Sequence, residues 1–141
     1  MSPRDTGTGD VFEKMIPPAL ERGKYKFEKQ VVVGKRLGGG SHKVDFLLTC
    51  QSGKQIVVST KWQQVSGTAE QKVPYEIMCL AQAIRNSNGA LAKAYLVLGG
   101  GGWRLRDFYL GNGLREYMKN CGSVEVMSLE TFVAEANQGR L

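Results

Sequence analysis

Apolar and polar positions alternate along three segments in the first half of the chain, a pattern typical of half-buried β-strands. The segments cover residues 25–33, 44–49 and 55–62. Glycine-rich turns separate them, and the short turn over residues 51–54 predicts a hairpin. Two later apolar runs, 93–98 and 124–127, predict a fourth and a fifth strand. The first three strands therefore form an antiparallel meander.

Helical periodicity follows the third strand. Four apolar residues repeat at i, i+3, i+4 and i+7, which predicts one buried helical face: Ile77, Leu80, Ala81 and Ile84. Residues 114–119 predict a short helix, and Ser128 is typical of the N-cap of a final helix that ends at Asn137. A helix between two strands predicts a crossover connection, so the fourth strand runs parallel to the third.

The chain before the first strand predicts a tail over residues 1–8 and then a broken helix. Thr8 or Asp10 can cap that helix, and Pro17-Pro18 interrupts it because proline lacks a donor and clashes with the preceding turn. A short helical turn then runs to Arg22. Together the elements predict a single α/β domain over residues 9–141, with a mixed central sheet flanked by helices.

Composition narrows the classes of function. The 141 residues include one His and three scattered cysteines without a CxxC pair, which excludes a cysteine-rich zinc site and disfavours a disulfide framework. Any bound metal is then a hard cation held by carboxylates. No apolar run approaches the length of a membrane-spanning helix, and no secretion signal is visible, so we expect a cytoplasmic protein with reduced cysteines. The net charge of +6 favours an acidic partner such as nucleic acid.

An aspartate and a lysine occupy unusual places in the predicted hairpin. Asp45 lies on the second strand, and Lys61 ends the third strand, where Val57 and Ser59 share its face. The neighbours Ile56, Val58, Thr60 and Trp62 face the other side. Burying a carboxylate and an ammonium is costly unless each has a partner or a metal. This pair is therefore either a structural ion pair or part of an active site.

These residues resemble the PD-(D/E)XK nuclease superfamily, whose fold is restriction-endonuclease-like. The family pattern is an acidic residue on one strand and acid-x-lysine on the next. Asp45 resembles the first carboxylate, Lys61 the lysine and Gln63 the glutamine that often follows it, and Glu13 resembles a helical glutamate found before the strands in many members. The similarity covers roughly residues 9–98. It implies an endonuclease of the restriction-endonuclease-like α/β fold.

The sequence departs from the family pattern at two positions. Val44 replaces the proline before the aspartate, and Ser59 replaces the acid before x-Lys. Some superfamily members with serine-x-lysine supply the missing carboxylate from the following helix. Glu70 and Glu76 are the candidates here, with a preference for Glu76 because the migrated acid lies about two turns into the helix. Alternatively, Ser59 is a substitution that attenuates or abolishes activity.

The mechanism implied by this resemblance is metal-assisted phosphodiester hydrolysis. Asp45 and the helical glutamate, Glu76 or Glu70, would hold Mg²⁺, for which Mn²⁺ substitutes, and the backbone carbonyl of Thr60 is a further candidate ligand. Lys61 would orient or deprotonate the attacking water, or stabilise negative charge in the transition state. Glu13 joins the same site if its family role applies.

Basic and polar residues near this site are candidates for contacts with DNA. They are Lys35, Arg36, His42, Lys43, Gln63, Lys72, Arg104 and Arg106. The glycine run over residues 99–102 lacks the spacing of a phosphate-binding loop, so no nucleotide cofactor is expected. No membrane partner is expected either.

The sequence therefore predicts a divalent-metal-dependent DNA endonuclease. The small size favours a structure-selective or low-specificity enzyme, such as a junction-resolving or nicking nuclease of phage type. Cutting two strands requires two sites, so a homodimer is expected. The alternatives are a compact restriction-type endonuclease and a DNA-binding module that keeps the fold but has lost cleavage.

Overall fold

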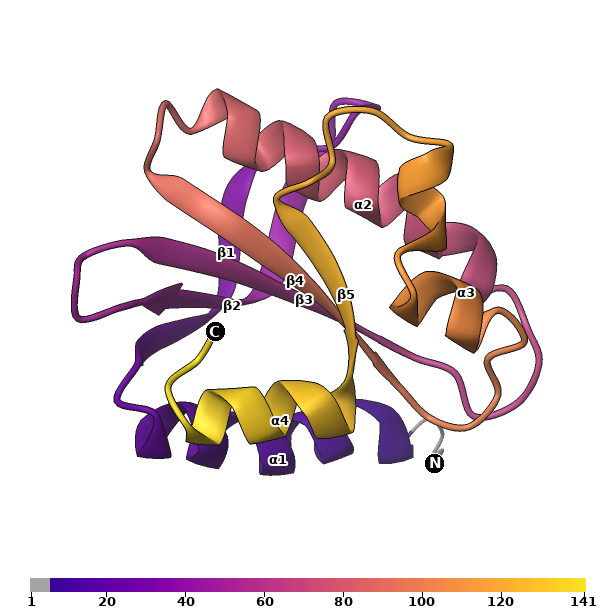
Figure 1. Cartoon of the computed structure of the whole chain (residues 1–141), viewed down its shortest axis with the longest axis horizontal. Coiled ribbons are helices and arrows are strands. Elements are labelled where there is room, and N and C mark those ends of the chain that lie inside the picture. Colours follow the sequence, from indigo (N-terminus) through magenta and orange to yellow (C-terminus); the bar gives the residue numbers. More distant parts are fainter. Residues whose placement is uncertain (1–5) are drawn as a thin grey trace.

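Five strands form one mixed sheet in the order β1-β2-β3-β4-β5, and helices lie on both of its faces (Figure 1). The computed structural model describes residues 6–141. The strands are β1 (Lys26–Lys35), β2 (Ser41–Thr49), β3 (Gln55–Trp62), β4 (Leu91–Gly99) and β5 (Val124–Ser128). The pairs β1–β2 and β2–β3 are antiparallel, and β3–β4 and β4–β5 are parallel. The predicted mixed sheet and α/β class are confirmed.

The first helix, α1 (Thr6–Arg22), runs through Pro17 and Pro18 without a break. The predicted interruption is therefore wrong. Each proline costs the helix a hydrogen bond, but the residues around them pack inward, and Ile16, Ala19 and Leu20 are completely buried. Tertiary burial of this face outweighs the loss, because most helical stability in proteins comes from packing.

The start of α1 also differs from the prediction. The helix begins at Thr6, ahead of the predicted caps at Thr8 and Asp10. Of the predicted tail over residues 1–8, residues 1–5 lie outside the described part of the chain.

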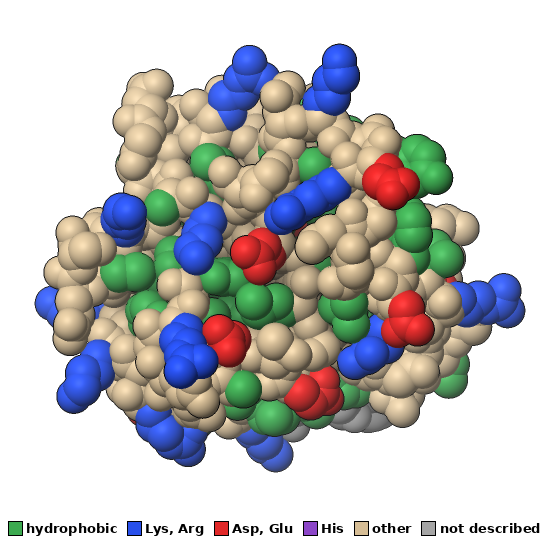
Figure 2. Space-filling model, viewed as in Figure 1, with side chains coloured by type: hydrophobic (Ala, Val, Ile, Leu, Met, Phe, Trp, Pro, Cys, Tyr) green, Lys and Arg blue, Asp and Glu red, His purple; other side chains and the backbone are tan. Residues whose placement is uncertain are grey.

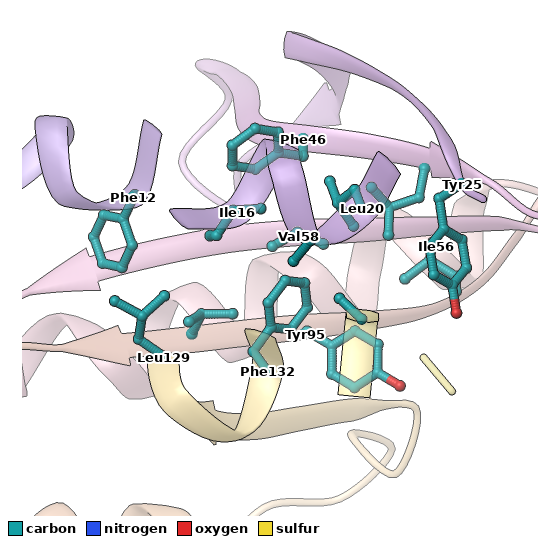
Figure 3. Close-up of a cluster of buried hydrophobic side chains, with 14 residues drawn as sticks. Phe12, Ile16, Leu20, Tyr25, Phe46, Ile56, Val58, Tyr95, Leu129 and Phe132 are labelled. Carbon is teal, nitrogen blue, oxygen red and sulfur yellow. The ribbon is translucent and has the colours of Figure 1, made fainter. Parts of the chain in front are cut away.

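Helix α4 (Leu129–Asn137) lies beside α1 on one face of the sheet (Figure 1). Between these helices and the strands is a core of large side chains, in which Phe12, Ile16 and Leu20 of α1 meet Val58 of β3 and Phe132 of α4 (Figure 3). As predicted, Ser128 caps α4, because its hydroxyl accepts the backbone N–H of Thr131 at 3.1 Å.

Helix α2 (Ala69–Asn86) covers the opposite face and buries a second core with Val57 of β3 and Leu96 of β4. The predicted alternation along β3 is confirmed, since Ile56 and Val58 pack with α1 and α4 while Val57 packs with α2. The chain then forms α3 (Arg106–Leu110), which the pattern does not predict. The 3₁₀ helix η1 (Gly113–Glu116) covers only the first half of the helix predicted over residues 114–119. No helix in the described part of the chain has the length and apolar character needed to cross a membrane.

Strand β2 changes faces at Asp45. Val44 packs in the core under α2, whereas Phe46, two residues later, packs in the core under α1 and α4. Residues two apart in a regular strand share a face, so the strand is irregular here. The pairing of β2 with β3 also ends here, with Phe46 opposite Val58 as its last pair. Strands β2 and β3 therefore separate at Asp45.

Candidate active site

Glu76 is a buried carboxylate that is hydrogen-bonded to three side chains. It lies on the buried face of α2, and its side chain is 2% exposed. One oxygen, Oε2, accepts the hydroxyl of Ser59 at 2.9 Å and contacts His42 Nε2 at 2.9 Å. The other, Oε1, accepts Arg36 at 3.0 Å and lies 4.0 Å from Lys61 Nζ. The partners of Glu76 thus come from β2, from β3 and from the residue that follows β1.

This environment keeps Glu76 ionised. Burial by itself raises the pKa of the Glu76 carboxyl, because it disfavours the charged form. The hydrogen bond from His42, the charge of Lys61 and the hydrogen bonds from Arg36 and Ser59 outweigh burial, and they lower the pKa of Glu76 to about 2. Because an ionised carboxylate only accepts hydrogen bonds, His42 Nε2 must carry a proton in this contact.

Asp45 is held where β2 and β3 separate. Its Oδ2 accepts the backbone N–H of Thr60 at 2.8 Å and the Thr60 hydroxyl at 3.1 Å. The carboxylate thus binds an N–H that lies beyond the last β2–β3 pair. On the β1 side, Gln30 has a positive φ of 54° and its Nε2 lies 3.5 Å from Asp45 Oδ1. The Asp45 side chain is half-buried.

Adjacent residues of β3 therefore bind the two carboxylates. Ser59 donates to Glu76 of α2, and Thr60 donates to Asp45 of β2. Lys61 follows directly, with a side chain that is 25% exposed. The sequence Ser59-Thr60-Lys61 thus joins two acids and one base from three elements of the fold.

The other two predicted acids lie in different surroundings. The carboxylate of Glu70 accepts the backbone N–H of Leu105. The backbone carbonyl of Glu70 accepts the Tyr109 hydroxyl at 2.7 Å. Glu70 thus ties the start of α2 to α3, and none of its recorded contacts involves Ser59. Glu13 is exposed and forms a 2.8 Å ion pair with Lys29 of β1.

Two residues predicted to contact DNA are buried in the structure. His42 is fully buried beside Glu76, and its Nδ1 has no hydrogen-bond partner. Gln63 is 5% exposed, donates to the Gly102 carbonyl at 2.8 Å and accepts the Ala69 N–H at 3.0 Å. In this structure neither side chain is available to a phosphate, and both hold neighbouring segments in place.

The remaining basic candidates, apart from Arg36, are exposed: Lys35, Lys43, Lys72, Arg104 and Arg106. Arg36 is half-buried because it reaches Glu76. In the view of Figure 2, Lys and Arg side chains are scattered over the face and its margin and do not merge into one patch. The positive charge on this face is therefore dispersed.

The carboxylates of Asp45 and Glu76 are ligands of the kind that a hard divalent cation prefers, although they are only two. Within residues 6–141, no group of three or more His, Cys, Asp or Glu side chains is arranged to hold a metal ion. Mg²⁺, however, uses one or two carboxylates and keeps several water ligands. Asp45 of β2 and Glu76 of α2, which are bound by the neighbouring β3 residues Thr60 and Ser59, supply that number of carboxylates.

Several contacts in this region are invisible to sequence patterns. Gln30 lies opposite Asp45 in a conformation that non-glycine residues seldom adopt, and nothing in its neighbours marks it. The link between Glu70 and Tyr109 joins residues 39 apart. The sequence signal for the Ser59–Glu76 contact is a serine two residues before a lysine. That Glu76 is the partner of Ser59 follows only from the packing of α2 against β3.

Comparison with known proteins supports one family. A model of the PD-(D/E)XK nuclease superfamily domain matches residues 4–140. Among solved structures, a protein of unknown function named AF1548 is similar in fold, with a TM-score of 0.53 and 10% sequence identity. The match covers 81% of this chain but 54% of that one, about half its length. No curated protein sequence gives a significant match. The family match spans nearly the whole chain, which therefore belongs to the PD-(D/E)XK nuclease superfamily.

Proposed function

We propose that this protein is a divalent-metal-dependent DNA endonuclease whose missing strand acid is replaced by Glu76. The observation that carries this proposal is the 2.9 Å hydrogen bond from Ser59 to Glu76. It connects the position that departs from the family pattern with a buried, ionised carboxylate beside Lys61. Glu70 is a weaker candidate, because its carboxylate is engaged by Leu105.

Asp45 and Glu76 would hold the cation, which we take to be Mg²⁺ or Mn²⁺, and the carbonyl of Thr60 is a third candidate ligand. Such a cation, when bound, acidifies a water and neutralises charge on the reacting phosphate. Thr60 fixes the Asp45 carboxylate through two hydrogen bonds, and His42 and Ser59 fix Glu76. These contacts supply the rigid positioning that such a site requires.

Lys61 is the candidate for handling the attacking water. In hydrolysis the water oxygen bonds to phosphorus, one bridging P–O bond breaks, and the released oxygen takes up a proton. Lys61 is partly exposed and lies 4.0 Å from Glu76 Oε1, so its ammonium can orient that water and stabilise charge on the phosphate. Glu13 is a more peripheral candidate, because it is exposed and paired with Lys29.

The exposed basic residues are the candidate contacts to the DNA backbone. Lys35 and Lys43 flank the β1–β2 turn, Lys72 lies on α2, and Arg104 and Arg106 follow the glycine run. Dispersed backbone contacts carry no sequence information. They support a low-specificity or structure-selective enzyme, and we expect a homodimer where both strands are cut.

A cleavage assay tests this function. Purified protein is incubated with supercoiled plasmid and with linear, nicked, flapped and four-way DNA, in Mg²⁺, Mn²⁺ or EDTA. We expect cleavage with either metal, none in EDTA, and loss of cleavage in Glu76→Gln and Asp45→Asn. Equal cleavage by the wild type and both variants would refute the proposed site.

One observation favours a second candidate, a DNA-binding module without cleavage. Arg36, Lys61 and His42 already satisfy Glu76 without a metal. If the protein binds the same DNA panel but leaves it intact under Mg²⁺ and Mn²⁺, this second function is the correct one.

A further inference from the structure

The two oxygens of Glu76 face different surroundings. The partners of Oε2 are both deeply buried, since His42 is 0% exposed and Ser59 is 3% exposed. The partners of Oε1 reach solvent, because the side chains of Arg36 and Lys61 are 31% and 25% exposed. One oxygen anchors the carboxylate in the interior, and the other points toward the accessible side.

Arg36 occupies the accessible oxygen. Its guanidinium lies 3.0 Å from Oε1, whereas Lys61 is at 4.0 Å. A divalent cation that binds Glu76 from the accessible side must approach the same oxygen. The cation and the Arg36 guanidinium therefore compete for Oε1, because the two positive groups repel each other and both need the lone pairs of this oxygen.

Arg36 also belongs to a segment suited to phosphate. It begins the β1–β2 turn, where its N–H donates to the Gly40 carbonyl at 2.7 Å and its carbonyl accepts the Gly39 N–H at 2.8 Å. Lys35 and Lys43 beside this turn are exposed. A phosphate bound by these lysines would offer the guanidinium a second anionic partner with bidentate geometry.

We propose that Arg36 is a placeholder cation on Glu76, which a divalent metal displaces and which transfers to a phosphate of bound nucleic acid. Metal and nucleic acid then bind with positive coupling, because the phosphate removes the competitor of the metal. Arg36 is thus a positioning residue that ties metal loading to substrate binding. This inference rests on the proposed function, in which Glu76 is a metal ligand.

Calorimetric titration with Mn²⁺ alone tests the placeholder role without any cleavage. Arg36→Gln should bind Mn²⁺ about tenfold more tightly than the wild type, as expected for loss of one partly exposed charge-assisted contact. Lys35→Gln is the matched control, because it removes the same charge one residue away, and its affinity should stay within about twofold of the wild type. If Arg36→Gln proves too unstable, Arg36→Lys replaces it, with a smaller gain.

Glu76→Gln separates the two proposals. If this variant loses Mn²⁺ binding while Arg36→Gln binds like the wild type, the placeholder is refuted and the metal role of Glu76 stands. If Glu76→Gln binds Mn²⁺ as the wild type does, the metal role of Glu76 is refuted and the placeholder with it. Equal gains in Arg36→Gln and Lys35→Gln would indicate general charge effects and also overturn the placeholder.

A second titration tests the transfer to phosphate. Mn²⁺ is titrated in the presence of a short phosphorothioate-linked duplex, which resists hydrolysis. The duplex should raise the Mn²⁺ affinity of the wild type and raise it several-fold less in Arg36→Gln, because the competitor is already gone. An equal increase in both proteins would overturn the coupling.

Discussion

Ser59 and Glu76 are joined by a 2.9 Å hydrogen bond across the interface between β3 and α2, seventeen positions apart in the chain. In the proposed site, the serine stands where the superfamily pattern has an acid, and Glu76 supplies the carboxylate in its place. Ser59 therefore has a structural function that an acid at its position could not serve, since a carboxylate cannot donate a hydrogen bond to another carboxylate.

This contact predicts the outcome of restoring the family acid. Ser59→Glu places a second carboxylate against Glu76 in a buried setting, and like charges there disfavour ionisation of both. We expect a loss of at least about 2 kcal/mol in the free energy of unfolding and reduced plasmid cleavage. Urea unfolding and a nicking assay measure the two effects.

Ser59→Ala is the control for that substitution. It removes only the hydrogen bond and should cost about 1 kcal/mol. A strong rise in cleavage by Ser59→Glu would contradict our assignment, and it would indicate that the serine is a replacement for a missing acid.

Lys61 is expected to be required for cleavage and dispensable for binding. Lys61→Ala removes the ammonium beside Glu76 Oε1, whereas the proposed contacts to the DNA backbone involve other exposed side chains. Cleavage should fall by at least about 100-fold, while duplex affinity by fluorescence anisotropy changes by less than about threefold. Lys54→Ala, which removes the same charge from the β2–β3 turn, should cleave normally. Full activity in Lys61→Ala would refute its role.

The strands of this fold could be predicted because each carries its own two-residue period. Val57 separates from Ile56 and Val58 by alternation alone, and the structure places it in the other core. Ser59 follows the period of Val57 and binds Glu76 of α2. The irregularity at Asp45 could not be predicted, because Val44, Phe46 and Leu48 keep the alternation of a regular strand in the sequence.

Helix α1 and the choice of glutamate show why other features escape sequence reasoning. Proline propensity predicts a break at Pro17, yet burial of the surrounding face keeps α1 intact. Glu70 and Glu76 lie on one helix, and their different contacts follow from how α2 packs against β3 and α3. Family resemblance could identify both residues, but only tertiary geometry distinguishes them.

The structure gives Gln63 a bridging role between two segments, whereas the family resemblance implies a contact with DNA, and one substitution tests the two roles. Its amide bridges Gly102 and Ala69, so Gln63→Ala leaves a partly buried carbonyl and a partly buried N–H without these partners. We expect a loss of about 2 kcal/mol in the free energy of unfolding. The neighbouring Gln64 is exposed, and Gln64→Ala should have little effect on stability. Unchanged stability together with weakened DNA binding in Gln63→Ala would instead support a direct contact with DNA.

The lowered pKa of Glu76 predicts a specific dependence of stability on pH. Glu76 has a pKa of about 2 in the folded protein, against 4.5 for an ordinary glutamate. The unfolded chain therefore takes up the proton first as the pH falls. The stabilisation is fully present above about pH 4.5 and is lost as the pH falls toward 2, and its full size is about 3 kcal/mol.

Glu76→Gln removes this titration, so the difference in unfolding free energy between wild type and variant should shrink by about 2 kcal/mol from pH 7 to pH 3. Urea unfolding at intervals across this range measures it. His42→Leu retains the carboxylate but removes a hydrogen bond that lowers its pKa, and should therefore show a weaker pH dependence than the wild type. If wild type and Glu76→Gln give parallel curves over this range, the buried carboxylate is not held ionised by its neighbours, and the network around Ser59, His42 and Arg36 does not have the electrostatic role described.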